Sequence, residues 1–278
     1  MAVIEVNNLT KDYGHRRGVF DVSLHVEKGE VFGFLGPNGA GKTTTIRHLM
    51  GFSAPQKGKT AIGGLDSWKH SAKILENVGY LPGEPAIPEN LTGTQFIRMM
   101  QGLRNSHDEA RLKYLLDLFA LDPRGKTKRM SLGSKRKLAV ITAFMADPDI
   151  LLLDEPTSGL DPVMQERFIE FMREEKKRGK TILLSSHIFS EVDAVCDRLA
   201  IIKDGEIVST VRTADIRHNE NKTYKITFKD GTTETVNVND RDINGLIKRL
   251  AAGGAVASFK EEKFTLEKHF LHFYEKGA

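Results

Sequence analysis

Cysteine is almost absent from this chain. Cys196 is the only one among 278 residues, which excludes both an intrachain disulfide and a four-cysteine zinc site. This cysteine content suits a reducing compartment. Long hydrophobic runs are lacking as well, since none approaches the roughly 20 apolar residues of a membrane-spanning helix. The first residues show no basic stretch followed by an apolar run, so we predict neither a signal peptide nor a helix that crosses a bilayer.

The net charge is also small. The 41 basic and 37 acidic residues leave a formal charge of +4, too little to indicate nucleic acid or an anionic membrane surface as a partner. Residues 204–278 hold 12 acidic and 12 basic residues, so the whole excess lies in residues 1–203. With 40% hydrophobic residues the chain can bury a sizeable core, and a disordered, collagen-like or coiled-coil protein is excluded.

Short apolar runs alternate with helical patterns over the first two hundred residues. These runs are continuous, which is typical of strands buried on both faces, and they cover residues 31–35, 150–154, 181–185 and 199–203. Ser106 and Glu109 match a capping box at the start of one helix, and Asp161 followed by Pro162 predicts the start of another. Strands alternating with helices predict an α/β domain.

The pattern changes beyond residue 203. Residues 223–228 and 233–238 alternate in polarity and flank Asp-Gly at 230–231, which predicts a β-hairpin. Helices are expected at 243–250 and 266–274. We therefore interpret residues 211–278 as a small α+β appendix. Dimer stabilisation, regulation and contact with a partner remain open as its role, and its neutral charge favours packing or dimerisation.

A glycine-rich loop follows the first of the continuous runs. Residues 36–43 fit G-x-x-x-x-G-K-[ST] between a strand and a helix, the setting in which backbone N–H groups surround phosphate. Lys42 should reach the β- and γ-phosphates and Thr43 should offer its hydroxyl to Mg²⁺. A chance glycine-rich turn is the alternative. The expected nucleotide-binding residues of the loop are Gly36, Asn38, Gly39, Gly41, Lys42, Thr43 and Thr44.

Two carboxylates end the strand at 150–154. Asp154 and Glu155 should lie at the carboxyl edge of the sheet, where ligands bind in open α/β folds. Asp154 can hold Mg²⁺ and Glu155 can accept a proton from an attacking water. An acidic turn on the surface is the alternative. The presence of the phosphate loop in the same chain favours the nucleotide site over this alternative.

Further motifs make residues 3–210 resemble the ATP-binding subunit of an ABC transporter, and they occur along the chain in the order that is typical of that family. They are the aromatic Tyr13, a signature-like Ser-Leu-Gly-Ser-Lys at 131–135, a Ser-Gly-Leu-Asp loop ending at Asp161, and Ser-Ser-His ending at His187. The resemblance implies a P-loop NTPase core of ABC type at 1–210, with a helical subdomain at about 86–147 that carries the signature loop. Residues 211–278 would form a separate accessory domain.

The resemblance also implies roles for these residues. Tyr13 would stack on adenine, His187 would sense the γ-phosphate, and Asp161 would lie at the nucleotide interface. Ser131 and Gly133 would contact ATP held by a second subunit packed head-to-tail. Seven basic residues between 124 and 137, Arg136 among them, would suit such an approaching phosphate, although a solvated basic face is the alternative.

Two motifs depart from the family pattern. Gly83 stands where the family usually has glutamine, and we hypothesise that Glu84 replaces that side chain as a contact of Mg²⁺ or its water. Leu132 and Ser134 replace a glycine and a glutamine of the signature, which puts a tight, symmetric dimer in doubt. These departures resemble the drug- and antibiotic-export branch.

The resulting prediction is an ATP- and Mg²⁺-dependent ATPase subunit that powers transport, with export favoured, by separate membrane-spanning subunits. It would act as a homodimer or heterodimer, in the cytoplasm on the inner face of the cell membrane, without nucleic acid. One alternative is a soluble ABC-type ATPase acting on nucleic acid or the ribosome, and another is a regulatory module without turnover. The transported substrate stays open.

Overall fold

A computed structural model describes residues 2–104, 106–217, 221–239, 242–253 and 256–262. The chain divides into two compact units, Met1–Thr210 and Val211–Ala278, which are treated separately below. The helix expected at 266–274 lies outside the described residues.

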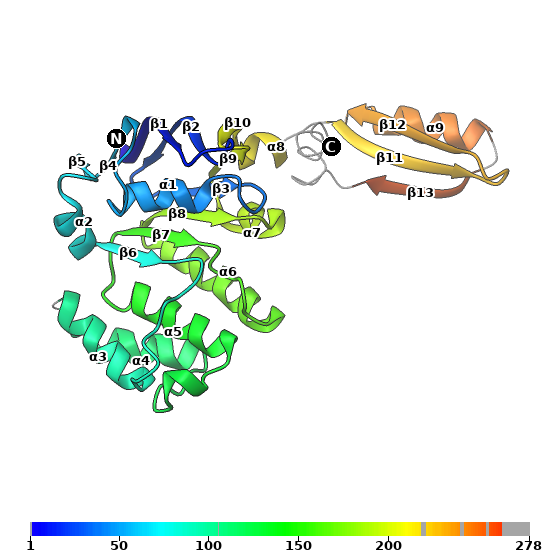
Figure 1. The fold of residues 1–278 in the computed structure, drawn as a ribbon. Coiled ribbons are helices and arrows are strands. Elements are labelled where there is room, and N and C mark those ends of the chain that lie inside the picture. The colour runs from blue at the N-terminus through cyan, green and yellow to red at the C-terminus, as the bar shows by residue number, and fades with distance from the viewer. Residues whose placement is uncertain (1, 105, 218–220, 240–241, 254–255, 263–278) are drawn as a thin grey trace. The chain divides into compact units, whose positions relative to one another are not determined.

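A largely parallel, six-stranded sheet forms the centre of the first unit (Figure 1). In spatial order its strands are β10 (Glu206–Arg212), β9 (Arg198–Lys203), β3 (Val31–Leu35), β8 (Thr181–Ser186), β7 (Ile150–Asp154) and β6 (Val78–Leu81). The four continuous apolar runs predicted as strands are β3, β7, β8 and β9, and this prediction is confirmed. The interiors of these strands are buried, as expected for a sheet with helices on both faces.

The register of this sheet brings the motif residues together. β8 lies between β3 and β7 and pairs in parallel with both. Leu35 is opposite Ser186, and Asp154 is opposite Ser185. The residues that follow β3, β7 and β8 therefore share one edge of the sheet, which is where α/β folds bind ligands.

The sequence analysis did not predict the second sheet of this unit. Its four strands are β2 (Gly18–Glu27), β1 (Ala2–Asp12), β4 (Lys57–Ile62) and β5 (Leu65–Asp66). A hydrophobic core joins it to the parallel sheet and includes Val6 of β1, Phe34 of β3 and Ile46 of helix α1. This core fixes the base of the helix that follows the phosphate loop.

Helices complete the first unit, and three of them, α3 to α5, occupy residues 93–144 (Figure 1). The helices are α1 (Lys42–Leu49), α2 (Ser71–Asn77), α3 (Gly93–Arg104), α4 (Glu109–Leu118), the 3-10 turn η1 (Thr127–Arg129), α5 (Leu132–Phe144), α6 (Pro162–Lys177) and α7 (Phe189–Val195).

One of the two predicted helix starts is confirmed. Asp161 caps α6, and its carboxylate accepts a hydrogen bond from the Met164 amide at 3.0 Å. The other is wrong: Asp108, not Ser106, caps α4, because its carboxylate accepts a hydrogen bond from the Arg111 amide at 2.8 Å.

His48 is a buried ionisable group in α1, and it makes folding sensitive to acid. Its Nδ1 lies 2.8 Å from the Thr44 carbonyl oxygen. Burial lowers the pKa of His48 below its ordinary value. As the pH falls through about 6.5, His48 is therefore protonated in the unfolded chain, whereas in the folded chain it is protonated only at a lower pH. Stability contributed by the neutral ring is present above that pH and is lost as the pH falls.

We expect the free energy of unfolding to fall as the pH is lowered from 7.5 to 5.5, with His48 contributing part of that loss. Urea titrations at both pH values will measure it. In His48→Asn this part of the pH dependence should vanish, whereas His70→Asn, at an exposed histidine, should keep it. Equal pH dependence in the two variants would contradict the assignment.

The second unit is a small α+β fold. Helix α8 (Thr213–Arg217) precedes a three-stranded sheet, in the order β12 (Thr233–Asn239), β11 (Asn221–Phe228) and β13 (Val256–Glu262), with α9 (Ile243–Gly253) between β12 and β13. The predicted hairpin is confirmed, and Gly231 takes a φ of 86° in its turn. Tyr224, Ile226 and Leu246 form the buried core.

Within the part of the chain that the structure describes, no helix is both long and apolar enough to span a membrane.

Candidate nucleotide site

The phosphate loop curls between β3 and α1. Gly39 and Gly41 take φ values of 84° and 111°, which a side chain would strain. Lys42 is buried, and its ammonium donates to the carbonyl oxygens of Gly36 at 2.6 Å and Pro37 at 3.1 Å. Among the described residues, no side chain caps α1, so the backbone N–H groups of its first turn are available to an anion.

Three polar side chains form a line across the edge of the sheet. Lys42 Nζ lies 3.0 Å from Glu155 Oε1, and His187 Nδ1 lies 2.6 Å from Glu155 Oε2. Glu155 is thus held between the loop lysine and the histidine that follows β8. The structure brings these three predicted residues together, and a general base at this point can face a phosphate bound by Lys42.

Asp154 is fully buried at the end of β7. Thr43 donates its hydroxyl to Asp154 Oδ2 at 2.7 Å, and the Ser185 hydroxyl donates to Oδ1. A Cβ added to Gly83 would lie 3.2 Å from Asp154 Oδ2. A larger residue at position 83 would therefore crowd the carboxylate.

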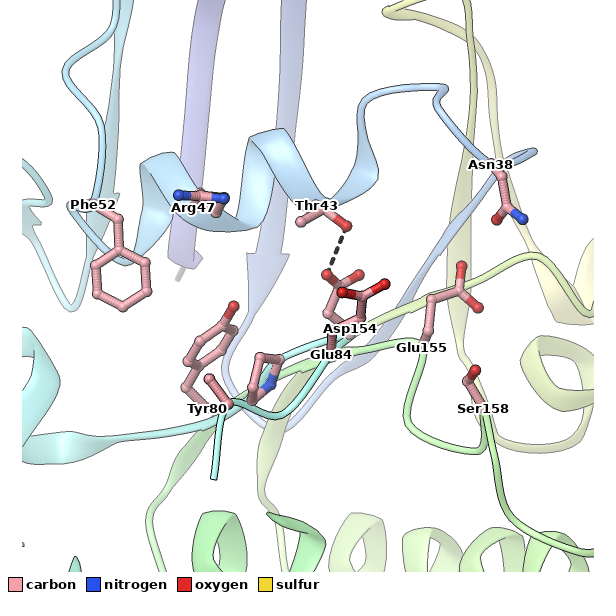
Figure 2. Close-up of a pocket in the computed structure, with 12 residues that line it drawn as sticks. Asn38, Thr43, Arg47, Phe52, Tyr80, Glu84, Asp154, Glu155 and Ser158 are labelled. Atoms are coloured by element: carbon pink, nitrogen blue, oxygen red, sulfur yellow. Dashed lines mark hydrogen bonds between the residues drawn. The ribbon is translucent and has the colours of Figure 1, made fainter. Parts of the chain in front are cut away.

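Two cavities open onto these groups, and Figure 2 shows the residues that line the larger one. The smaller one, of about 190 Å³, is lined by Asn38, Gly39, Gly41, Lys42, Thr43, Thr44 and Glu155. The larger one, of about 760 Å³, is lined by Asn38, Thr43, Arg47, Phe52, Tyr80, Pro82, Gly83, Glu84, Ala86, Asp154, Glu155 and Ser158. Burial and the nearby Asp154 carboxylate raise the pKa of Tyr80 to about 12, so its hydroxyl remains protonated at neutral pH.

The oxygen atoms around Asp154 fit a hard divalent cation. The Thr43 hydroxyl and the Asp154 carboxylate already converge, and Figure 2 shows the Glu84 carboxylate pointing to the same side of the cavity. Mg²⁺ is commonly held by one or two such groups together with phosphate oxygens and water. No group of three His, Cys, Asp or Glu that could hold a metal occurs in the described ranges.

Six predicted residues do not line these two cavities: Gly36 and His187, which are described above, and the four that follow. Tyr13 is exposed just after β1, with the Lys11 ammonium 5.7 Å from its ring centroid. Asp161 is engaged as the cap of α6. Ser131 caps α5 and lines a separate cavity of about 430 Å³, and a Cβ on Gly133 would lie 3.2 Å from the Gly159 carbonyl oxygen. A single chain thus does not place the signature loop in the cavities beside Lys42.

Glu191 of α7 is a residue that the sequence analysis missed. It is buried, and its carboxylate accepts hydrogen bonds from the Ser186 hydroxyl at 2.8 Å and from the Thr157 hydroxyl. Burial raises the pKa of its carboxyl group. Because Thr157 follows Glu155 closely and Ser186 precedes His187, Glu191 ties together the backbone on both sides of the site.

Arg136 corrects the prediction of a basic cluster facing phosphate. Its side chain is 1% exposed and donates only to backbone carbonyl oxygens, so it is neither part of a solvated basic face nor available to an incoming phosphate. The helical period offers a signal for this, since residue 136 shares a face of α5 with the buried positions 139, 140 and 143.

Comparison with known proteins shows the family of this chain. The family model for ABC transporters matches residues 19–158. The ABC transporter ATP-binding protein YhcH of Bacillus subtilis is 34% identical over 260 residues, covering 90% of this chain and 84% of that protein. The bacitracin transport ATP-binding protein BcrA of Enterococcus faecalis is 32% identical over 276 residues, covering 98% of this chain and 84% of BcrA.

A solved ATP-binding subunit of an ABC transporter is also similar. It is 32% identical, has a TM-score of 0.72, and the match covers 77% of this chain and 92% of that one. The chain therefore belongs to the ABC transporter family. It is an ATP-binding subunit with the ABC-type P-loop fold, and its enzymatic activity is ATP hydrolysis. The alternative of an ATPase acting on nucleic acid or the ribosome has no support among these relatives.

Proposed function

We propose that this subunit binds Mg²⁺–ATP at the edge formed by β3, β7 and β8 and uses its hydrolysis to drive export through separate membrane-spanning subunits. The observation that supports this most is the position of Glu155, whose carboxylate lies 3.0 Å from Lys42 Nζ and 2.6 Å from His187 Nδ1. An acceptor beside a phosphate-binding lysine and a histidine suits in-line attack by water.

Each residue at this edge has a defined task. Residues 36–44 bind the phosphates through backbone N–H groups, and Lys42 moves from Glu155 to the β- and γ-phosphates. Thr43, Asp154 and Glu84 would hold Mg²⁺, which neutralises phosphate charge when bound. Glu155 accepts the proton of the attacking water, and His187 donates a hydrogen bond to the γ-phosphate. Tyr13, exposed after β1, supplies a stacking surface for adenine.

The active assembly is a dimer of ATP-binding subunits. Ser131 and Gly133 of one subunit reach the γ-phosphate bound by the other, with Asp161 at the same interface. The separation of the signature cavity from the loop cavities in one chain supports this arrangement. The dimer closes when ATP adds contacts available only in the closed state, and hydrolysis removes them.

Export of an antibiotic-like compound is the substrate class that we favour, because the relative that aligns with 98% of this chain is a bacitracin transport protein. The subunit would lie on the cytoplasmic face of the membrane, bound to its partners. Residues 1–210 would carry the ATPase activity and residues 211–278 would form an accessory domain.

Affinity purification from the membranes of native cells tests this proposal. A membrane-spanning protein should copurify with the tagged chain, and deletion of either gene should sensitise cells to the same compounds. The reconstituted pair should hydrolyse ATP faster in the presence of such a compound. Copurification with ribosomes or nucleic acid instead would refute the proposed function.

Glu84 is the residue whose role departs most from the family pattern. If it helps to hold Mg²⁺, Glu84→Ala should raise the Mg²⁺ concentration for half-maximal hydrolysis by about tenfold, as for other supporting groups of metal sites. Glu89→Ala, at an exposed glutamate, is the matched control. Titration of ATPase activity with Mg²⁺ will measure the shift. Unchanged Mg²⁺ dependence together with unchanged transport would exclude the role.

A further inference from the structure

Arg136 of α5 combines two properties that rarely occur together. Its guanidinium is almost completely buried, and its hydrogen bonds in the described structure all go to main-chain oxygens. The acceptors are the carbonyl oxygens of Pro82 at 2.6 Å, Asp154 at 2.9 Å, Gly83 at 3.0 Å, Pro156 at 3.0 Å, and Glu155. Burial lowers the pKa of Arg136 to about 10, so the group still carries its charge at neutral pH.

These five carbonyl groups belong to two segments at the nucleotide site. One is the turn after β6, which leads into Glu84, and the other is the segment that contains Asp154 and Glu155. Arg136 itself lies one helical turn after Ser131, the cap of α5. A single planar guanidinium with its donors in fixed directions thus connects the signature helix to both segments.

The backbone of Glu155 depends on such support. It has a φ of 48°, in the left-handed region that is uncommon for residues other than glycine. Its amide donates to the Ser185 carbonyl oxygen at 3.1 Å, and its own carbonyl oxygen accepts from Arg136. The same carbonyl oxygen also accepts from the Ser158 amide at 3.1 Å, so removal of Arg136 would leave this strained peptide with one hydrogen bond fewer on its carbonyl side.

α5 also approaches β6 closely. A Cβ added to Gly79 of β6 would lie 2.6 Å from the Ala143 carbonyl oxygen, so glycine allows the helix to pack directly on the strand. Arg136 therefore acts from a helix whose position is fixed by packing, which is what a group that orients other residues requires.

We propose that Arg136 is a positioning residue for ATP hydrolysis, which holds the Glu155 backbone and the turn before Glu84 in the arrangement needed for catalysis. This inference rests on the proposed role of Glu155. Arg136 is buried beneath these segments and acts through the backbone of the residues that we assign to the reaction. None of its five acceptors belongs to the phosphate loop, so it should set the rate of turnover and not the affinity for ATP.

Arg136→Met keeps most of the side-chain length and removes every donor. We expect its kcat to fall about a hundredfold, as for comparable misplacement of a catalytic group, with the Kd for ATP unchanged. Arg136→Lys keeps the charge and a few of the five hydrogen bonds and should have an intermediate rate. Full-length variants will be compared by steady-state hydrolysis and equilibrium ATP binding, with the folded fraction determined by circular dichroism.

Arg198→Met is a matched control for loss of a structural guanidinium. Arg198 pairs with Glu30 at 2.7 Å and donates to the His25 carbonyl oxygen at 2.7 Å, at the start of β9. This variant should lose stability and keep its kcat. The double variant Glu155→Gln with Arg136→Met should be no slower than Glu155→Gln alone, because both changes remove the same function.

Three results would overturn the proposal. They are a wild-type kcat in Arg136→Met, a loss of ATP affinity in Arg136→Met that parallels its loss of kcat, and a double variant whose rate loss is the product of the losses in Glu155→Gln and Arg136→Met. Failure of both Arg136 variants to fold would also overturn it, because the role would then be purely structural. If wild-type protein hydrolyses no ATP, the proposed function fails instead, and the two failures are therefore distinguishable.

Discussion

Replacing Glu155 with glutamine is expected to slow ATP hydrolysis by about two to four orders of magnitude, the usual contribution of a general base. Glutamine keeps the size and the hydrogen-bonding oxygen of the side chain but cannot accept the proton of the attacking water. The position of Glu155 between Lys42 and His187 makes it the acceptor best placed for this task. Single-turnover hydrolysis with the purified subunit will measure the effect.

ATP binding should survive this substitution or become tighter. In the structure the Glu155 carboxylate forms an ion pair with the Lys42 ammonium, and its negative charge would repel an incoming phosphate. Loss of that negative charge removes both effects, so an ATP-bound dimer should accumulate and be visible by light scattering. Glu170→Gln, at an exposed site on α6, should behave as wild type in both assays. An undiminished hydrolysis rate in Glu155→Gln would refute the assignment of the base.

The sequence was sufficient for those parts of the site that follow a buried strand. Continuous apolar runs predicted β3, β7 and β8, and parallel pairing then places Lys42, Glu155 and His187 at one edge. The position of Ser131 could not be tested in the same way. Its proposed partner is a nucleotide on another subunit, so no pattern of contacts within one chain brings it to the loop.

The antiparallel sheet escaped prediction for a different reason. β1 and β2 are buried on alternate positions, and shifts of register interrupt that alternation, as between Val6 and Leu9. A period of two that breaks after a few residues is a weak signal. Ser106 was a poor guide to α4 because Asp108 caps it instead. The burial of Arg136 does not follow from the run of basic residues around it, but from its place on the buried face of α5.

A buried ionic network joins α4 to α6, and its central residue is Glu175. Glu175 is 1% exposed and binds two guanidinium groups, with Arg111 Nη2 at 2.8 Å and Arg178 Nη1 at 2.9 Å. Arg111 is itself mostly buried and lies over the Phe171 ring at 5.5 Å. Asp147 is a more distant partner, 3.9 Å from Arg111 and 2.6 Å from Arg178.

Glu175→Ala should therefore lower the free energy of unfolding by about 3 kcal/mol, the low end of the cost of breaking a buried ion pair. The loss arises because Arg111 stays buried without its main counter-charge, and Asp147 compensates only in part. Arg178 is more exposed and can turn to water. Glu170→Ala, at an exposed position on the same helix, should cost less than about 1 kcal/mol. Urea unfolding of both variants will measure these differences.

A double substitution separates the cost of an unpaired charge from the loss of contacts. Arg111→Met with Glu175→Met removes both buried charges and keeps apolar volume, and such replacements are often close to neutral. We expect the double variant to be more stable than Glu175→Met alone, because it also removes the buried Arg111 charge that loses its partner, while Arg178 keeps Asp147 at 2.6 Å in both variants. If the stability losses of Arg111→Met and Glu175→Met add up in the double variant instead, the network stabilises the junction of α4 and α6 through its contacts. The unpaired charge of Arg111 is then not the cause of the loss in Glu175→Met.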